Sequence, residues 1–259
     1  EVDLVIGYVE SDHQVPEMGG ISIYKFNKKH VRNMLLPFCR HLKKRNPDVV
    51  FSAEDHLNTI ILIAAILTRS TAKISCSSRV TPYDTYSNIL FSKRWFLKQL
   101  NKMVMWRADV LSCVSIDMAK QYEDVFHKPT HVCVYNIVDN RYSRKKMTEF
   151  VEHEWYKHKD YPILVAAGKL APWKGFKDLI YAIKELSRKR KVRLLILGDG
   201  PLRSELQALI IELCLTKVVS LLGYVENPLK FFEGADVFVL TSYVEGLPNV
   251  LVEAMMCGC

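Results

Sequence analysis

Short apolar segments alternate with amphipathic stretches along this chain of 259 residues. The first half of the pattern predicts strands at Val2–Val9, Val49–Ser52, Lys73–Cys76, Val110–Val114 and His131–Tyr135. The helices expected between them are Val31–Arg45, Leu57–Thr68, Ile89–Trp106 and Ile116–Val125. Strand–helix alternation produces parallel sheets covered by helices on both faces, so the sequence predicts an α/β fold.

A second series of the same kind follows a polar, charged connector. It predicts strands at Ile163–Ala167, Val192–Leu197, Val218–Leu221 and Val237–Leu240, and helices at Lys174–Arg188, Pro201–Leu213, Pro228–Glu233 and Val250–Met256. We therefore expect two α/β domains, residues 1–140 and 161–259, joined by a linker at 141–160. The chain starts inside an expected strand and stops where a further strand is expected, so both domains are expected to be incomplete.

The charge distribution favours an anionic partner. The net charge is +8, and residues 141–191 alone hold 14 basic and 6 acidic side chains. A phosphorylated substrate, a nucleic acid or an acidic membrane surface would suit this excess, and so would an ordinary solvated surface. The longest apolar run, Ile60–Leu67, is far shorter than the roughly 20 residues of a membrane-spanning helix. Seven scattered cysteines fit free thiols in a reducing compartment.

The first motif that indicates chemistry is GKLAPWKGF, residues 168–176, which follows a buried strand and opens a helix. Gly168 allows the backbone to approach a ligand closely. Lys169 and Lys174 place two ammonium groups near a strand end and a helix N-terminus, an arrangement that attracts a diphosphate. Two surface lysines on a turn would give the same pattern.

The second motif is YVEGLPNVLVEAMMCG, residues 243–258. Glu245 lies in the loop after a strand, and Glu253 lies in the helix that follows Pro248. Free backbone N–H groups at the start of this helix can receive phosphate oxygens, and a carboxylate can accept from the vicinal hydroxyls of a ribose or hexose. Helix capping and surface charge are the alternative.

The third motif, LGDGPLRSEL at residues 197–206, has only the opening of a dinucleotide fingerprint, because Arg203 stands where the third glycine belongs. In this order, the three motifs resemble the donor-binding half of the retaining glycosyltransferases of family 4. The resemblance runs from Ile163 to Cys259 and continues more loosely through NPDVVFSAED and RADVLSCVSIDMAKQY. It implies a GT-B fold, in which an acceptor-side and a donor-side Rossmann-like domain face each other across a cleft.

The resemblance also implies a donor site, which by position comprises Gly168, Lys169, Lys174, Gly198, Tyr224, Val225, Glu245, Gly246, Leu247, Pro248, Asn249, Val250 and Glu253. Lys169, where relatives usually have Arg, and Lys174 would bind the diphosphate. Glu253 would bind the ribose, and Glu245 with the loop backbone would hold the sugar. The resemblance makes Lys169, Lys174 and Glu245 the catalytic candidates, while the segment at Tyr224 and Val225 would bind the base.

Two departures from the family pattern concern the first domain. The glycine-rich loop near the N-terminus of relatives is absent here and would be expected before residue 1, and the final helices of the second domain would be expected after residue 259. The stretch SCSSRVTPYD lacks the His that relatives often place over the donor sugar, and Arg79 is the charged candidate there for a phosphate of donor or acceptor. No Asp-x-Asp motif occurs in the chain. We therefore expect no metal and no other cofactor.

A basic and aromatic segment, FSKRWFLKQLNKMVMWR at residues 91–107, contains no acidic residue. Amphipathic helices of this composition lie on anionic membranes. The membrane candidates are Lys93, Arg94, Trp95, Phe96, Lys98 and Lys102, with an apolar side expected to include Trp95, Phe96, Leu100, Met103 and Val104. An ordinary helix with its apolar stripe in the core is the alternative.

These observations favour a retaining, metal-independent glycosyltransferase that uses a UDP-linked hexose or N-acetylhexosamine. The acceptor would be a lipid-linked or polysaccharide precursor at the cytoplasmic face of the membrane. A GDP-mannose-dependent mannosyltransferase and a non-catalytic sugar-nucleotide-binding protein remain alternatives. A dehydrogenase is disfavoured by Arg203 and by the lack of a ribose-binding acid about 20 residues beyond the glycines. No known nucleic-acid-binding module appears.

Overall fold

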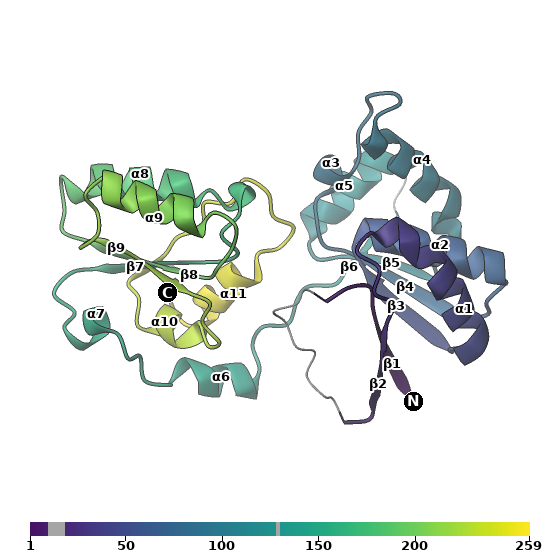
Figure 1. Ribbon diagram of the computed structural model, residues 1–259, viewed down its shortest axis with the longest axis horizontal. Coiled ribbons are helices and arrows are strands. Elements are labelled where there is room, and N and C mark those ends of the chain that lie inside the picture. The colour runs from purple at the N-terminus through teal and green to yellow at the C-terminus, as the bar shows by residue number, and fades with distance from the viewer. Residues whose placement is uncertain (10–18, 128–129) are drawn as a thin grey trace. The chain divides into compact units, whose positions relative to one another are not determined.

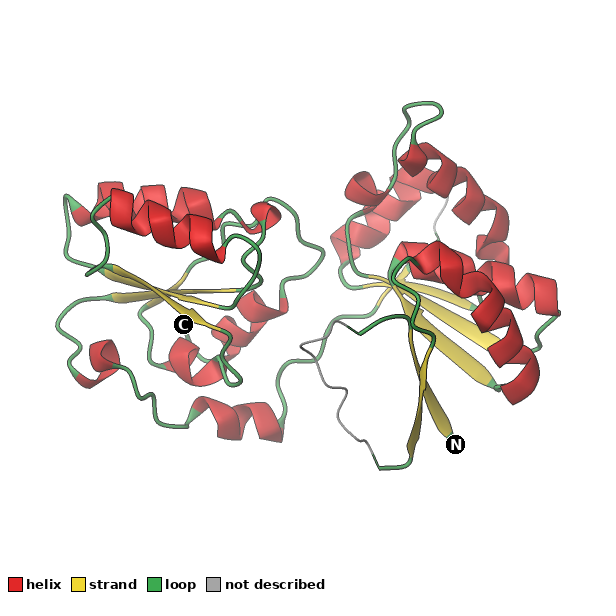
Figure 2. Cartoon of the chain, in the orientation of Figure 1, coloured by secondary structure: helices red, strands yellow, loops and turns green. Residues whose placement is uncertain are grey.

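A computed structural model describes residues 1–9, 19–127 and 130–259 and divides the chain into two units, Glu1–Tyr135 and Asn136–Cys259. Every pairing between named strands is parallel, as strand–helix alternation predicts. Both units are α/β, with helices packed on the sheets (Figures 1 and 2).

The first unit contains a two-stranded sheet and a four-stranded sheet. Strands β1 (Val2–Ile6) and β2 (Ile21–Lys25) form the smaller one, and the larger has the order β3-β4-β5-β6. Its strands are β3 (Val49–Ala53), β4 (Lys73–Ser78), β5 (Val110–Cys113) and β6 (Val132–Cys133). The helices are α1 (Leu35–Arg45), α2 (Asp55–Thr68), α3 (Pro82–Thr85), α4 (Lys93–Val104) and α5 (Ile116–Phe126), with short 3-10 turns at Val31–Met34 and Met105–Arg107.

The second unit has one sheet of order β10-β7-β8-β9. Its strands are β7 (Ile163–Ala167), β8 (Arg193–Leu197), β9 (Val219–Gly223) and β10 (Val237–Phe238). A 3-10 turn at Pro172–Lys174 precedes α8 (Phe176–Ser187), and the remaining helices are α9 (Arg203–Glu212), α10 (Leu229–Glu233) and α11 (Asn249–Met256). Leu194 and Leu195 in the middle of β8 are fully buried and belong to separate apolar clusters, so both faces of this sheet are covered.

Residues 141–160, expected as a linker, contain α6 (Arg141–Met147) and α7 (Glu154–Lys157) and belong to the second unit. The Tyr156 hydroxyl donates to the carbonyl oxygen of Phe231 in α10 at 2.6 Å. Val151 is buried in the same apolar cluster as Phe231. The apolar side chains of a charged segment thus complete one face of the core.

Several predicted helices begin later than expected, and for two of them the structure shows the local reason. The helix predicted from Ile89 begins at Lys93, because the Ser92 hydroxyl accepts from the N–H of Trp95 at 3.1 Å and caps it there. The helix predicted from Lys174 begins at Phe176, because Gly175 has a φ of 65° and separates it from the 3-10 turn. The sequence also did not predict β2 and α3, which are five and four residues long.

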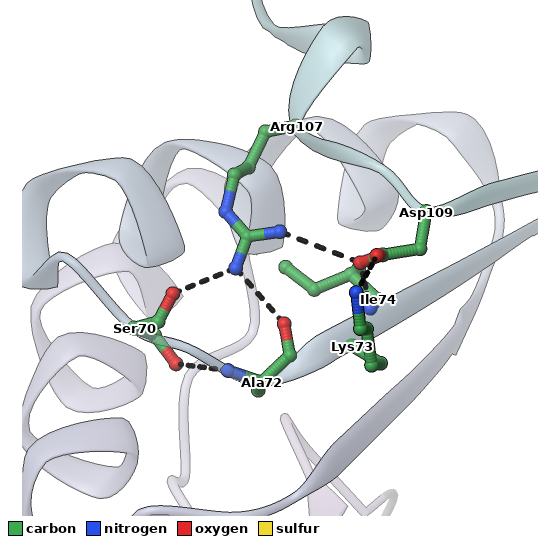
Figure 3. Close-up of polar contacts among 6 residues, drawn as sticks. All are labelled: Ser70, Ala72, Lys73, Ile74, Arg107 and Asp109. Carbon is green, nitrogen blue, oxygen red and sulfur yellow. Dashed lines mark hydrogen bonds and ion pairs between the residues drawn. The ribbon is translucent and has the colours of Figure 1, made fainter.

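An aspartate fixes the strand register at the amino end of each large sheet. The carboxylate of Asp109, just before β5, accepts from the N–H of Ile74 in β4 at 2.9 Å and from Lys73 Nζ at 2.9 Å (Figure 3). Arg107 bonds the same carboxylate and donates to the carbonyl oxygens of Ser70 and Ala72. The bond from Lys73 lowers the pKa of Asp109.

The second unit repeats this arrangement. Asp236, just before β10, accepts from the N–H of Ile163 in β7 at 2.8 Å and pairs with Lys159 Nζ at 2.9 Å. In both sheets, the aspartate that precedes one strand therefore bonds the backbone at the start of the neighbouring strand. These aspartates lie at the amino ends of the strands. Ligands bind in such folds at the opposite, carboxyl ends, where the loops follow the strands.

Candidate functional site

The predicted donor-site residues of the second unit follow strand ends at one edge of the sheet. Gly168 and Lys169 follow β7, Gly198 follows β8, and Tyr224 directly follows β9. The loop after β10 carries residues 245–248 and leads into α11. Because these strands are parallel neighbours, their carboxyl ends meet at the same edge, where open α/β sheets bind ligands.

Beneath these loops, the backbone segments at the ends of β7, β8 and β9 contact one another directly. The N–H of Gly168 donates to Leu197 at 2.9 Å, and the N–H of Gly198 donates to Gly223 at 2.7 Å. A Cβ on Gly198 would lie 2.0 Å from the carbonyl oxygen of Gly168, and Gly198 has a φ of 127°. Glycine is therefore required at position 198 by the close approach of two loops, independently of any nucleotide.

Two of the catalytic candidates form an ion pair. Lys174 Nζ lies 2.5 Å from Glu245 Oε1, and both side chains are mostly buried. The stem of Lys174 packs beside Gly168, where a Cβ would lie 3.6 Å from its Cε atom. Since an ammonium group has three donors, Lys174 can hold Glu245 and still bind a phosphate oxygen. Lys169 is exposed, so its ammonium group is open to an anionic ligand.

The loop between β10 and α11 is held close to the first motif. A Cβ on Gly175 would lie 2.1 Å from the carbonyl oxygen of Thr241, and the N–H of Tyr243 donates to the carbonyl oxygen of Trp173 at 2.8 Å. These contacts position the 3-10 turn that carries Lys174 against the segment that carries Glu245. Gly246, Leu247 and Pro248 continue this segment and are half-buried.

Helix α11 begins at Asn249, directly after Pro248, and no side chain caps its first turn. The amides of Asn249 and Val250 precede the first amide that bonds within the helix, which is that of Leu251. The side chain of Asn249 is held by Asn136, whose amide donates to its Oδ1 at 2.6 Å. The start of α11 thus has N–H groups that could donate to an anion.

Glu253 is a half-buried carboxylate one turn into α11. Its side chain makes no hydrogen bond or ion pair to any residue that the structure describes, and burial raises its pKa. Withdrawing an acceptor from water without providing a donor is unfavourable unless a ligand supplies the donor. Glu253 is therefore suited to accept hydroxyl groups from a bound molecule.

The segment expected to bind the base follows β9. Tyr224 is 80% exposed, whereas Val225 packs against the apolar cluster that contains Phe231 and Phe232. Val225 therefore anchors the segment to the core, and the backbone at Tyr224 remains at the surface.

In the first unit, the predicted phosphate candidate Arg79 lies near an acid, Glu54, that the sequence did not predict as part of a site. Arg79, at the end of β4, lies near the carboxylate of Glu54, which follows β3. Burial raises the pKa of Glu54, and the charge of Arg79 opposes that effect. The sequence contained a signal for this acid, because Glu54 and Asp55 directly follow an apolar strand, where site residues of α/β folds are found.

Glu54 has an unfavourable backbone conformation, with φ 82° and ψ 126°. We expect Glu54→Gly to raise the free energy of unfolding by about 1 kcal/mol, since glycine adopts positive φ without a Cβ clash. Urea unfolding followed by circular dichroism would measure this. Glu54→Gln keeps the strained backbone and serves as the control. An equal gain in Glu54→Gln would show that the carboxylate charge, not the backbone, is unfavourable.

Among the residues that the structure describes, no group of three or more His, Cys, Asp or Glu side chains could hold a metal ion. Within the same residues, no helix is both long and apolar enough to cross a membrane.

Residues 148–259 match the family model described as glycosyl transferases group 1. Most of the second unit is therefore similar to the group 1 glycosyltransferases. The matched residues include every donor-site residue predicted above, with the β7, β8 and β10 loops and α11 arranged around one sheet edge.

Two curated relatives extend the likeness into the first unit. The chain is 31% identical to an uncharacterized glycosyltransferase of Methanocaldococcus jannaschii, over 90% of this chain and 61% of that protein. It is 28% identical, over its whole length and 71% of the relative, to N-acetylgalactosamine-N,N'-diacetylbacillosaminyl-diphospho-undecaprenol 4-alpha-N-acetylgalactosaminyltransferase of Campylobacter jejuni. The chain thus spans about three-fifths of the length of the first of these relatives.

Solved structures show the fold of the chain. HepE from Anabaena, in complex with UDP, is 18% identical with a TM-score of 0.66, over 92% of this chain and 65% of that chain. Sucrose-phosphate synthase from Thermosynechococcus elongatus is 15% identical with a TM-score of 0.72, over 99% and 69% respectively. The predicted fold class, α/β of the GT-B type, is confirmed.

Proposed function

We propose that the protein is a retaining glycosyltransferase of the family 4 type that transfers a sugar from a nucleotide-sugar, with UDP as the nucleotide. The observation that carries this proposal is the half-buried carboxylate of Glu253 without a protein partner, beside the uncapped start of α11. A nucleoside diphosphate requires a carboxylate that accepts from the vicinal ribose hydroxyls, next to backbone N–H groups that donate to phosphate oxygens.

The residues of the second unit then have distinct roles. Lys174 and Lys169 stabilise the negative charge that develops on the leaving diphosphate, together with the amides at the start of α11. Glu253 orients the ribose. Glu245, held in place by Lys174, accepts hydrogen bonds from the donor sugar. The backbone at Tyr224 and Val225 contacts the base.

The acceptor in this proposal is a lipid-linked or polysaccharide precursor glycan. Its support is that two relatives in Campylobacter jejuni are named for transfer to undecaprenol-linked glycans. Arg79, beside Glu54 in the first unit, is the candidate for a phosphate of the acceptor or donor. We propose that the reaction takes place at the cytoplasmic face of an anionic membrane, with the protein bound peripherally.

A donor screen tests the function directly. UDP-linked hexoses and N-acetylhexosamines and GDP-mannose would each be titrated by calorimetry, and then incubated with a lipid-diphosphate-linked glycan acceptor. We expect binding and transfer with a UDP-sugar, and NMR of the product should show retention at the anomeric carbon. Transfer from GDP-mannose would favour the mannosyltransferase instead. Binding without transfer by the full-length protein would favour a non-catalytic sugar-nucleotide-binding protein.

We further expect nucleotide binding to be independent of divalent metal ions, because Lys169, Lys174 and the α11 amides supply the positive charge. The affinity for UDP, measured by calorimetry, should change by less than about threefold between EDTA and Mg²⁺. A loss of more than tenfold in EDTA would contradict this expectation.

A further inference from the structure

A turn in the first unit exposes three consecutive large apolar side chains. Ile89, Leu90 and Phe91 are 74%, 65% and 78% exposed, and they precede α4 directly. In Figure 1, the segment that joins α3 to α4 projects as a loop beyond the helices of this unit. Soluble proteins rarely expose such a contiguous apolar cluster without an interaction partner.

The outer side of α4 extends this apolar surface. Phe96, Leu100 and Met103, spaced at i, i+4 and i+7, are all exposed, as is Trp106 in the following 3-10 turn. The prediction that Val104 lies on the same side was wrong, because Val104 is buried in the core of the first unit. Helix α4 therefore already has a separate buried side, and the exposed apolar stripe is not needed for its packing.

Aromatic contacts join the turn to the helix. The ring of Phe91 lies 5.8 Å from that of Trp95 and 6.4 Å from that of Phe96, centroid to centroid. Phe91 also has a φ of 60°, in the region that favours glycine. The turn and the stripe thus form one surface, which we call the α4 surface: Ile89, Leu90, Phe91, Phe96, Leu100, Met103 and Trp106.

Four cations of α4 are interleaved in sequence with the α4 surface: Lys93, Arg94, Lys98 and Lys102. Arg94 donates to the carbonyl oxygen of Tyr83, and Lys98 donates to the side-chain oxygen of Asn88, at 2.7 Å each. Within the described residues, none of the four forms a salt bridge with a carboxylate, and residues 91–107 contain no acid. Their charge is therefore available to an external anion.

We infer that the α4 surface docks the protein on an anionic lipid bilayer, with the Ile89–Phe91 turn inserted among the headgroups. Large apolar and aromatic side chains bordered by Lys and Arg match an interface whose surface is negative and whose interior is apolar. A nucleic acid could contact the cations, but its phosphate backbone would not provide an apolar environment for the Ile89–Phe91 turn. This inference deepens the membrane location in the proposed function and rests on it, but it concerns no residue of the donor site.

Vesicle sedimentation tests the inference with two variants. Lys93→Gln/Lys98→Gln/Lys102→Gln removes charge, and Ile89→Ser/Leu90→Ser/Phe91→Ser removes the apolar turn while altering only exposed side chains. The matched control is Lys189→Gln/Arg190→Gln/Lys191→Gln, which removes three cations from the second unit. The chain would be mixed with phosphatidylcholine vesicles that contain either no anionic lipid or about 30% phosphatidylglycerol, which gives the surface a negative potential.

We expect the parent and the control to bind the anionic vesicles and to bind neutral vesicles much less. The charge variant should bind on the order of 10- to 100-fold more weakly at low salt. The turn variant should lose the portion of binding that persists at high salt, since salt screens only the charge contribution. The fluorescence of Trp95 and Trp106 should shift to shorter wavelength in the parent with anionic vesicles.

Binding by both variants equal to that of the parent would overturn the inference, as would a parent that ignores anionic vesicles. Self-association through the α4 surface, detected by sedimentation velocity and abolished by the turn variant, would overturn it in favour of a protein interface. UDP titration of every variant separates the two proposals. Normal UDP binding with no lipid binding contradicts only the docking surface, whereas lipid binding without UDP binding contradicts only the donor function.

Discussion

Glu253→Ala is expected to weaken the binding of free UDP by about 10- to 100-fold, because each charge-assisted hydrogen bond contributes roughly 1.5–3 kcal/mol. Glu245→Ala is expected to leave UDP affinity within about threefold and to lower the rate of sugar transfer on the order of 100- to 1,000-fold. The difference follows from their positions. Glu253 has no partner in the second unit, whereas Glu245 is paired with Lys174 and is assigned to the sugar.

Calorimetry with UDP measures the effect of each variant on nucleotide affinity, and initial rates with the UDP-sugar measure its effect on sugar transfer. Glu212→Ala, which changes an exposed glutamate of the same unit, is the control and should change neither quantity.

Because burial raises the pKa of Glu253, its carboxylate is protonated at a higher pH than an ordinary glutamate. UDP affinity should therefore decrease as the pH falls toward that raised pKa, and Glu253→Ala should remove this dependence. Equal losses of UDP affinity in the two alanine variants would refute the assignment.

The second prediction concerns the glycine contact beneath the donor site. Gly198→Ala would place a Cβ 2.0 Å from the carbonyl oxygen of Gly168 in a backbone with positive φ. Neither atom is on a flexible side chain, so the β7 and β8 loops must separate. We expect a loss of about 3 kcal/mol or more in the free energy of unfolding of the second unit and loss of UDP binding.

The control for this substitution is Gly258→Ala. Gly258 also has positive φ, at 82°, but a Cβ there meets no atom within 4 Å. Gly258→Ala should therefore lower the free energy of unfolding by only about 1 kcal/mol, because alanine is disfavoured at positive φ. Urea unfolding and UDP titration of both variants give the comparison. If Gly198→Ala were no more destabilising than Gly258→Ala, the close approach of the two loops would not exist in solution.

Much of this architecture could be predicted because local patterns determine it. The strands Ile163–Ala167 and Val49–Ser52 are apolar runs flanked by turn residues, and they match β7 exactly and β3 within one residue. Glu253 could be placed on a helix because Pro248 indicates a helix start. These signals lie within a few residues of the features they predict.

Features that depend on distant parts of the chain could not be predicted. Lys174 and Glu245 are 71 positions apart, and they meet because β10 lies beside β7 in the sheet. Strand order is set by the packing of the whole unit and not by any one segment. The apolar turn Ile89–Phe91 looked helical because its composition continues into α4, and only the Ser92 cap separates them.

The aspartates at the amino ends of the two sheets bear on how such a protein can evolve. Asp236 holds β10 in register with β7 at the strand ends opposite the donor loops, and Asp109 does the same for β4 and β5 within the first unit. Substitutions in the loops after β7, β9 or β10 therefore need not shift the sheet beneath them. A lineage can exchange its sugar or base preference by altering those loops, while the part of the molecule that determines foldability stays the same.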